Sequence, residues 1–523
     1  MRAPSSDEEQ PTSSTSTPIT RRADRIINPI SFHSGLRAST VGSRVEYRQL
    51  TLVVSGLTYG YTLRDEAALL TGAAYRPNLA ASREALNVQR EVAMLSALDN
   101  ERLARIGPGT EMGALMRRYW IPFLLTEDIP EADGDPVRVT LLGERLVAFR
   151  NSVGQVGLVD RLCAHRNADL FFGRNEENGI RCTYHGWKYD VDGKCTDMPS
   201  EASDSNFRDK IQLRAYPVRE RGGVLWTYMG PKEHMQPMPE FEWTRVPDGH
   251  RYVSWNFQEN NYAQAIEGGI DTVHSVYLHS AMDSHRRLND WQEAGRDSGD
   301  VTKMYRTRVN PPKLRALETD FGLIIGGRYP GDETQDYWRF NLFWMPFYTA
   351  PPGGGEGKMM HAFVPVDDVT TARWCFTWST TGKPLSARHI ADLRKGQGVH
   401  AQTIPGSHWP VRNMRNDYLI DREEQRHLTF TGIKGTGEQD FSVQEGMGQI
   451  SDRTREHLGV TDIGIIAMRR MLLHSAAAIR EGAEPTSARS PDAYRVRPGQ
   501  TMIPTDADWT THDNLKEAIA ATY

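Results

Sequence analysis

Two short segments of the sequence each combine one cysteine with one histidine. Cys163 and His165 are separated by one residue, and Cys182 and His185, after a gap of 16 residues, are separated by two. Two cysteines and two histidines in close pairs can hold a metal centre. Zinc takes this set in a tetrahedral site, and an iron–sulfur cluster can take it with two cysteines on one iron and two histidines on the other.

The order of the four ligands favours the iron–sulfur cluster over zinc. Each pair mixes one cysteine with one histidine, which suits a cluster whose two irons are each held by one residue from each loop. Gly186 would permit a tight turn there, and Trp187 and Tyr189 would shield the cluster from water. The remaining cysteines lie outside this pattern, so we expect Cys195 to be a buried free thiol and Cys375 to be a core residue.

A second group of possible ligands lies in the segment 258–279, which has a helical pattern. Glu267, Asp271 and His274 are four and three residues apart, so they would share one helix face. His279 would point about 140° away from His274 on an ideal helix, so the helix must end or bulge if both bind one metal. Two imidazoles and one carboxylate on a ferrous ion leave positions open for O2 and substrate.

The third ligand of such a centre need not be close in sequence. Residue chemistry alone does not separate Asp440 from Asp421. The candidates are Asp417, Asp421, Asp440, Glu445 and Asp452.

These motifs resemble those of a known family. Residues 184–193 resemble the signature of Rieske oxygenases, and residues 267–279 resemble their mononuclear iron motif. Further likeness at 108–120, 141–150, 416–423 and 447–459 points to the large (alpha) subunit of Rieske non-haem iron aromatic-ring-hydroxylating oxygenases, in the branch of phthalate 4,5-dioxygenase. It runs with gaps from about Met94 to residue 481.

The resemblance implies two cofactors, one 2Fe-2S cluster and one Fe(II) per subunit. The implied cluster ligands are Cys163, His165, Cys182 and His185. The implied iron ligands are His274, His279 and Asp440, the last because residues 435–445 resemble the family segment that supplies it. Asp271 would then be a catalytic bridging acid, hydrogen-bonded to an iron histidine and linked to a cluster histidine of the neighbouring subunit. Glu445 would be structural.

The implied fold class is α+β. A small all-β Rieske domain would be followed by an α+β catalytic domain with a central antiparallel sheet of the helix-grip, START-like type. We expect residues 94–245 to form the N-terminal helix and Rieske domain, and residues 246–523 to form the catalytic domain with its C-terminal helix. Residues 1–93 would be a disordered extension or the result of a start codon placed upstream of Met94.

Local patterns predict the elements that must position these residues. A capped helix is expected to start at Ser96. In residues 137–150, apolar and polar residues alternate, which predicts two strands joined at Gly143. Residues 320–350 and 358–380 have sheet patterns. Residues 462–481 have the spacing of a long amphipathic helix, which Thr461 or Asp462 could cap.

The implied function is that of an oxygenase component, which inserts oxygen from O2 into an aromatic, carboxylated substrate by ring dihydroxylation, hydroxylation or O-demethylation. No dinucleotide-binding fingerprint opens a helix, and too few cysteines remain for a plant-type ferredoxin cluster. Electrons must therefore come from a separate NAD(P)H-dependent reductase. A homotrimer or homohexamer is expected. The alternatives are a Rieske electron-transfer protein without oxygenase activity and a zinc protein without redox chemistry.

Composition excludes several other classes. The formal net charge of −5 gives no basic excess to neutralise nucleic acid phosphates. No apolar run approaches the roughly 18–20 residues that span a bilayer, and the N-terminus lacks the apolar core of a secretory signal. The expected location is the cytoplasm.

Overall fold

The computed structural model describes residues 48–54, 57–63, 94–280, 311–353 and 357–523. The chain divides into two units, Met1–Ala81 and Ser82–Tyr523. In the first unit, strands β1 (Arg48–Val54) and β2 (Leu57–Leu63) pair antiparallel. The other residues of the predicted extension 1–93 lie outside the described part, and so does the prediction of disorder there.

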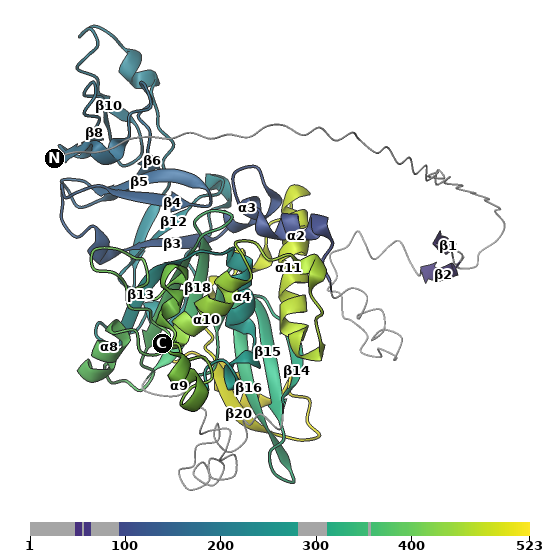
Figure 1. Ribbon diagram of the computed structural model, residues 1–523. Helices are drawn as coiled ribbons and strands as arrows, with labels where there is room; N and C mark the ends of the chain where they lie inside the picture. Colours follow the sequence, from purple (N-terminus) through teal and green to yellow (C-terminus); the bar gives the residue numbers. More distant parts are fainter. Residues whose placement is uncertain (1–47, 55–56, 64–93, 281–310, 354–356) are drawn as a thin grey trace, which may run out of the picture. The chain divides into compact units, whose positions relative to one another are not determined.

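The second unit begins with the capped helix that the sequence predicts. Helix α2 (Ala97–Ala104) starts after Ser96, whose side chain accepts the backbone N–H of Asp99. Helix α3 (Glu111–Met116) follows (Figure 1).

Three small antiparallel sheets follow these helices, and the hairpin predicted at 137–150 forms part of the first one. The first sheet has the order β4 (Val137–Leu141), β5 (Glu144–Arg150), β6 (Val156–Asp160). The second has the order β11 (Val218–Arg221), β12 (Val224–Tyr228), β3 (Trp120–Leu125). The third has the order β10 (Cys195–Asp197), β9 (Lys188–Tyr189), β8 (Gly179–Arg181), β7 (Arg174–Glu176).

A large antiparallel sheet follows, which confirms the predicted α+β class and the sheet patterns at 320–350 and 358–380. The main order is β13 (Arg251–Gln258), β19 (Thr371–Trp378), β18 (Lys358–Pro365), β17 (Tyr348–Ala350), β16 (Gln335–Trp344), β15 (Gly322–Tyr329), β14 (Lys313–Glu318). Strand β20 (Gly499–Pro504) pairs with β16 off the main path. The central strands, β15 to β19, are buried along most of their length, as expected for a sheet with a covered face, whereas the edge strand β14 is not.

Helices pack against this sheet. Helix α4 (Tyr262–Ile270) contacts β16, β17 and β18, and helix α11 (Ile463–Arg480) contacts β14 and β15 (Figure 1). The remaining helices of the described part are α8 (Ala387–Arg394), α9 (Arg422–His427), α10 (Thr436–Gly446), α12 (Thr486–Arg489) and α13 (Asp513–Ile519). In the described segments, no helix is both long enough and apolar enough to cross a membrane.

The long C-terminal helix predicted at 462–481 is confirmed as α11. The predicted cap is wrong, because the side chain of Asp462 stands at the N-cap position but makes no capping bond there. It accepts the backbone N–H of Gly459 instead.

The helix predicted at 258–279 is too long at both ends. Residue 258 closes strand β13, and helix α4 ends at Ile270. Asp271 is extended, with φ −67° and ψ 123°, and its carboxylate accepts the backbone N–H of Val273 at 2.7 Å. Such a local side-chain bond competes with helix continuation. Residues 274–276 form a separate 3-10 turn, so His274 and His279 are released from the helical geometry that would have turned them apart.

Candidate metal centres

The two cysteine–histidine segments fold into turns of the same design. The backbone N–H of Asn167 donates to the carbonyl of Cys163 at 2.9 Å, and the N–H of Gly186 donates to the carbonyl of Cys182 at 2.9 Å. Asn167 and Gly186 occupy the same place in their turns and both have positive φ, 58° and 78°. Asparagine and glycine are the residues that tolerate this conformation best. The sequence therefore builds two matching turns, each of which carries one thiol and one imidazole.

The imidazoles of the two turns face each other. The ring centroids of His165 and His185 lie 4.3 Å apart, and Trp187 stacks on His165 with centroids 4.5 Å apart. The Nδ1 atoms of both histidines are buried, and neither has a hydrogen-bond partner. Burying a nitrogen without a hydrogen-bond partner is costly. Two such nitrogens on facing rings are explained if both bind a metal ion. This donor set matches the two-histidine iron of the predicted cluster.

The two thiols lie beneath the surface in the same small core. Cys163 and Cys182 are both buried in a cluster with Tyr189. The hydroxyl of Tyr189 lies 3.2 Å from Sγ of Cys163. Burial raises the pKa of the Cys163 thiol, and the bond from Tyr189 opposes that rise. Trp187 and Tyr189 are buried, as predicted for residues that exclude water, and so are Cys195 and Cys375.

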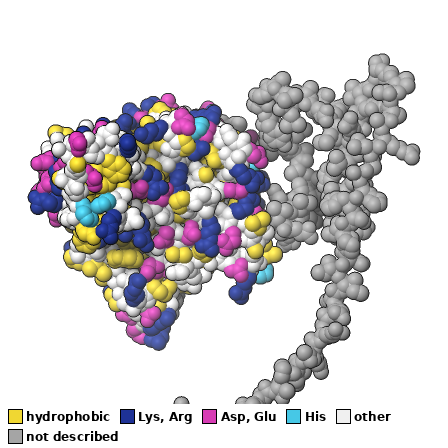
Figure 2. All heavy atoms as spheres, turned by 90° about the horizontal axis from the view of Figure 1, so that it is seen from above, with side chains coloured by type: hydrophobic (Ala, Val, Ile, Leu, Met, Phe, Trp, Pro, Cys, Tyr) yellow, Lys and Arg dark blue, Asp and Glu magenta, His cyan; other side chains and the backbone are white. Residues whose placement is uncertain are grey.

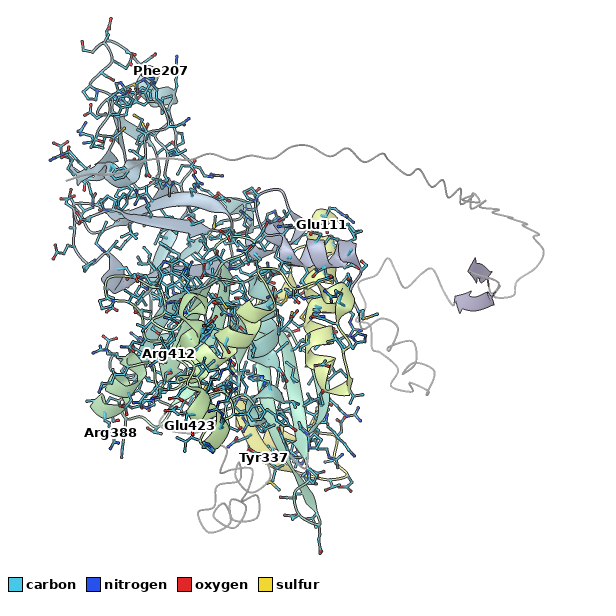
Figure 3. The ribbon with its side chains drawn as sticks, viewed as in Figure 1. Glu111, Phe207, Tyr337, Arg388, Arg412 and Glu423 are labelled. Atoms are coloured by element: carbon cyan, nitrogen blue, oxygen red, sulfur yellow. The ribbon has the colours of Figure 1, made fainter. Side chains whose placement is uncertain are left out.

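The surface around these turns is partly apolar. Figure 3 shows Phe207 at the outer end of the small-sheet region, and Phe207 packs edge-on against Trp187 with centroids 6.0 Å apart. Figure 2 views the molecule from above and shows hydrophobic and basic side chains intermixed. The exposed large apolar side chains of this region include Leu162, Phe172, Tyr184 and Phe207.

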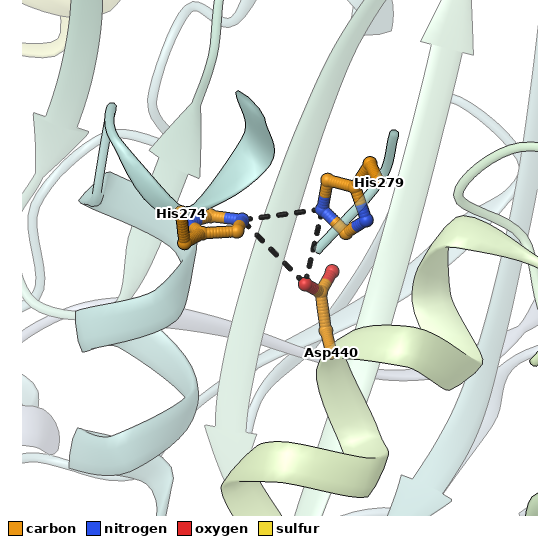
Figure 4. Close-up of side chains that lie close together, drawn as sticks. All are labelled: His274, His279 and Asp440. Carbon is orange, nitrogen blue, oxygen red and sulfur yellow. Dashed lines mark hydrogen bonds and ion pairs between the residues drawn. The ribbon is translucent and has the colours of Figure 1, made fainter. Parts of the chain in front are cut away.

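The second predicted centre brings together three side chains from two separate segments (Figure 4). Nε2 of His279 lies 3.2 Å from Oδ1 of Asp440 and 3.2 Å from Nε2 of His274, and Nε2 of His274 lies 3.6 Å from the same carboxylate oxygen. The three donor atoms all lie within 4.8 Å of one another. Two imidazoles and one carboxylate are the donors of a facial triad that keeps coordination positions open. The residues present therefore fit a mononuclear iron.

Of the five carboxylates that the sequence offered, Asp440 is the one that meets both imidazoles. Asp421 and Asp452 cap the starts of short helices. Glu445 accepts the hydroxyl of Tyr418 and the backbone N–H of Glu259, so its predicted structural role is confirmed. Asp417 is exposed, in a turn with positive φ.

The shared helix face predicted for Glu267, Asp271 and His274 is wrong, because α4 ends between them. Glu267 is buried on the other side of α4, where its carboxylate accepts hydrogen bonds from Arg453 and Arg469 at 2.8 Å each. Burial raises the pKa of Glu267, but the two guanidinium groups lower it more, and the pKa lies below its ordinary value. This cluster ties α4 to α11 and takes no part in the triad.

Two residues outside the triad contact its imidazoles. Oδ2 of Asp271 lies 3.3 Å from Nδ1 of His274, and Oε1 of Gln439 lies 2.8 Å from Nδ1 of His279. Burial raises the pKa of Asp440, but the bond to His279 and the charges around it lower it more, and its pKa is below the ordinary value. Sequence reasoning identified Asp271 and missed Gln439, for which adjacency to Asp440 was the only signal.

Glycines allow α4 to come close enough to form this site. A Cβ on Gly268 would lie 2.0 Å from Nε2 of Gln444 on α10, and a Cβ on Gly269 would lie 2.7 Å from the ring of Phe363 on β18. No real Cβ makes contacts that short. The two glycines therefore set the separation between α4 and both α10 and the sheet. That separation brings His274 to Asp440.

A cavity of about 350 Å³ adjoins the triad. Its lining includes Asp271, His274, His279 and Asp440, together with side chains from the sheet. Among the latter, Arg339 and His361 are buried polar residues that the sequence did not single out. Burial holds the pKa of His361 well below its ordinary value, with the charge of Arg373 as a further cause, so this imidazole is neutral. Strand periodicity was their only sequence signal.

Arg339 makes no ion pair with the acidic residues that line this cavity. Its side chain donates to the carbonyl of Pro352 at 2.5 Å, and its Nε is buried without a partner. Over the described ranges, none of the ion pairs involves Arg339. The wall of the cavity thus holds a buried guanidinium group without a direct ion-pair partner among the described residues.

Comparisons with known proteins agree with this geometry. Residues 119–217 match the family model "Rieske 2Fe-2S domain", and residues 227–522 match "LigXa C-terminal domain like". The oxygenase subunit of 3-chlorobenzoate-3,4-dioxygenase from Comamonas testosteroni is 36% identical over 430 residues, which cover 79% of this chain and 96% of that protein.

Two further relatives cover a similar share. The oxygenase subunit of phthalate 4,5-dioxygenase from Pseudomonas putida is 35% identical over 80% of this chain and 94% of its own. The oxygenase subunit of 5,5'-dehydrodivanillate O-demethylase from a Sphingobium species is 32% identical over 78% of this chain and 87% of its own. The chain therefore belongs to the Rieske non-haem iron oxygenases, in the phthalate 4,5-dioxygenase-like branch, as an oxygenase subunit that carries a 2Fe-2S cluster and a mononuclear iron and takes its electrons from a separate protein.

Proposed function

We propose that this oxygenase acts on an aromatic substrate with a carboxylate group, and that the carboxylate binds Arg339. The observation that carries the proposal is the buried guanidinium, 7% exposed, in the cavity that His274, His279 and Asp440 also line. Removing a charge from water is costly unless it is paired. An anionic substrate would supply the missing partner, and arginine binds carboxylates well through its planar fork of donors.

The relatives support this substrate class. Two of them are named for 3-chlorobenzoate and phthalate, which are aromatic carboxylates, and one is named for an O-demethylation. The outcome for this chain is then ring dihydroxylation, hydroxylation or O-demethylation. Which one occurs depends on the substrate atom that the cavity places beside the triad.

We assign the cofactor ligands from the same geometry. The iron is assigned to His274, His279 and Asp440. The cluster is assigned to Cys163, His165, Cys182 and His185. When bound, the cluster passes electrons and the mononuclear iron activates O2. Asp271 holds the proton on Nδ1 of His274, so that the lone pair of Nε2 faces His279 and Asp440.

The proposal extends to the assembly and to the electron donor. The side chain of Asp271 is 24% exposed, so a group of a second subunit could reach it. We propose a homotrimer or homohexamer in which Asp271 links the triad to a cluster histidine of the neighbouring subunit, and an NAD(P)H-dependent reductase as the donor. We propose 94–245 and 246–523 as the Rieske and catalytic domains.

The test uses the full chain, purified without oxygen and supplied with NADH and a generic reductase. Aromatic carboxylic acids and their neutral amides are compared as substrates. Arg339→Gln should raise KM for the acid about 10- to 100-fold, the range expected for loss of a charge-assisted bond, and should leave KM for the amide unchanged. Arg328→Gln, which breaks the ion pair with Asp336 outside the cavity, is the matched control.

Two results would contradict the proposal. Equal KM values for Arg339→Gln and the unsubstituted chain on the acid would exclude the carboxylate contact. The second result is a cluster whose absorption shows that it can be reduced, in a protein that forms no product from any aromatic acid. This would favour the alternative, an electron-transfer protein without oxygenase activity.

A further inference from the structure

Gln439 stands next to Asp440 on α10 and contacts the other side of the same imidazole. Oε1 of Gln439 lies 2.8 Å from Nδ1 of His279, whose Nε2 lies 3.2 Å from Oδ1 of Asp440. One turn of α10 therefore contacts both nitrogens of His279.

The orientation of the Gln439 amide is fixed by a second bond. Its Nε2 donates to the carbonyl of Ile433 at 2.8 Å, and a carbonyl can only accept. Oε1 must then be the atom that faces His279. Because an amide oxygen also only accepts, Nδ1 of His279 must carry the proton. Nε2 is left with its lone pair, and it points toward His274 and Asp440.

The two histidines of the triad have unlike partners. His274 meets the carboxylate of Asp271 at its Nδ1, whereas His279 meets a neutral amide. A charged partner makes an imidazole a stronger donor to a metal than a neutral partner does. In the triad, His274 therefore has a negatively charged hydrogen-bond partner, whereas the neutral partner of His279 fixes only the orientation of its ring.

We propose that Gln439 is a positioning residue that holds His279 in its Nδ1–H tautomer, so that Nε2 faces the metal, and that it sets how tightly the triad holds iron. This inference rests on the proposed assignment of iron to His274, His279 and Asp440. Gln439 is neither a proposed metal ligand nor part of the cavity lining, so it would affect metal binding only through the imidazole of His279.

The test measures metal binding directly. The mononuclear iron is removed from the full-length protein with a chelator, the cluster absorption is used to show that the chain remains folded, and Co(II) is titrated anaerobically while its d–d bands are recorded. Gln439→Leu should weaken Co(II) binding about 10- to 100-fold, the usual cost of losing such a partner, and should change the band pattern.

Two further variants separate orientation from packing. Gln439→Glu keeps an oxygen that accepts from Nδ1 and adds a negative charge, so Co(II) affinity should recover at least to that of the unsubstituted chain. Ser442→Ala removes a bond to the carbonyl of Gln439 in the same helix without touching an imidazole, and should leave the affinity and the band pattern unchanged. Gln439→Leu with unaltered affinity and bands would overturn the inference.

The same titration separates this inference from the function it rests on. If the unsubstituted chain binds Co(II) but Asp440→Ala binds it equally well, the metal does not occupy the triad and the proposed iron assignment fails. If Asp440→Ala abolishes binding and Gln439→Leu does not weaken it, only the role of Gln439 fails.

Discussion

Asp271 both ends helix α4 and contacts an imidazole of the triad. Oδ1 of its carboxylate accepts the backbone N–H of Val273 at 2.7 Å, and Oδ2 lies 3.3 Å from Nδ1 of His274. Burial raises the pKa of Asp271, but its bonds with His274 and with backbone N–H groups lower it more, so the pKa is below its ordinary value and the group is ionised at neutral pH. The residue that breaks the helix is thus the one that orients His274.

Replacing Asp271 with Asn should separate metal binding from turnover. Asparagine can still accept the N–H of Val273, but the negative charge beside His274 is lost. We expect unchanged cluster absorption, unchanged iron content and a fall of about 100-fold in product formed per electron consumed, at the upper end of the usual effect of such partners. Iron analysis and single-turnover product assays check this. Normal product formation would exclude the bridging role.

Glu267 should contribute stability that depends on pH. Its folded pKa is depressed below the ordinary value of 4.5, so its contribution is complete above pH 4.5 and is lost as pH falls through the folded pKa. Glu267→Gln should lower the free energy of unfolding by about 3 kcal/mol at pH 7, and the difference should shrink below pH 4.5. Urea unfolding at several pH values measures it. Glu318→Gln, which breaks an exposed pair with Arg470, should cost less than about 1 kcal/mol.

Gly269→Ala should loosen the iron site and leave the cluster intact. The new Cβ would lie 2.5 Å from Oγ1 of Thr349 and 2.7 Å from the ring of Phe363, so α4 must move. We expect a loss of about 1–3 kcal/mol in stability and reduced iron content with normal cluster absorption. Gly446→Ala places its Cβ in open space at the end of α10 and is the control. Full iron occupancy in Gly269→Ala would show that the spacing of α4 is not limiting.

Tyr189→Phe should lower the reduction potential of the cluster. The hydroxyl near Sγ of Cys163 stabilises the additional negative charge of the reduced form. A neutral hydrogen bond contributes about 0.5–1.5 kcal/mol, which corresponds to about 20–60 mV for one electron. A redox titration followed by EPR measures the shift. Tyr216→Phe removes a hydroxyl bonded to Glu144, away from the two turns, and should leave the potential unchanged.

Local elements of the fold were predictable from local sequence. The cap at Ser96, the hairpin at 137–150 and helix α11 are set by neighbouring residues, and the structure has them within a residue or two of the predicted bounds. The helix predicted at 258–279 was too long because the spacing of apolar residues does not indicate where a helix ends. Here the carboxylate of Asp271 accepts the backbone N–H of Val273, and the helix stops.

The site was predictable only in part. The paired cysteine–histidine turns and the closely spaced His274 and His279 are local patterns. Gln439 meets His279 across 160 residues of sequence, and Arg339 becomes notable only because the fold buries it without a partner. Such features depend on tertiary contacts, which residue spacing does not encode.

The cavity draws its walls from two different kinds of element. His274, His279 and Asp440 come from the segment that follows α4 and from α10, whereas other residues of the lining stand on strands of the large sheet: Arg339, Asn341, Met359, His361 and Thr377. Alternating strand residues can be exchanged singly without altering the backbone that holds the imidazoles. Substitutions on the strands of the sheet can therefore change the substrate range while the residues of the triad stay the same. Libraries aimed at new substrates should vary Met359 and Thr377 and keep Asn341, whose side chain donates to the carbonyl of Ile270 at the end of α4.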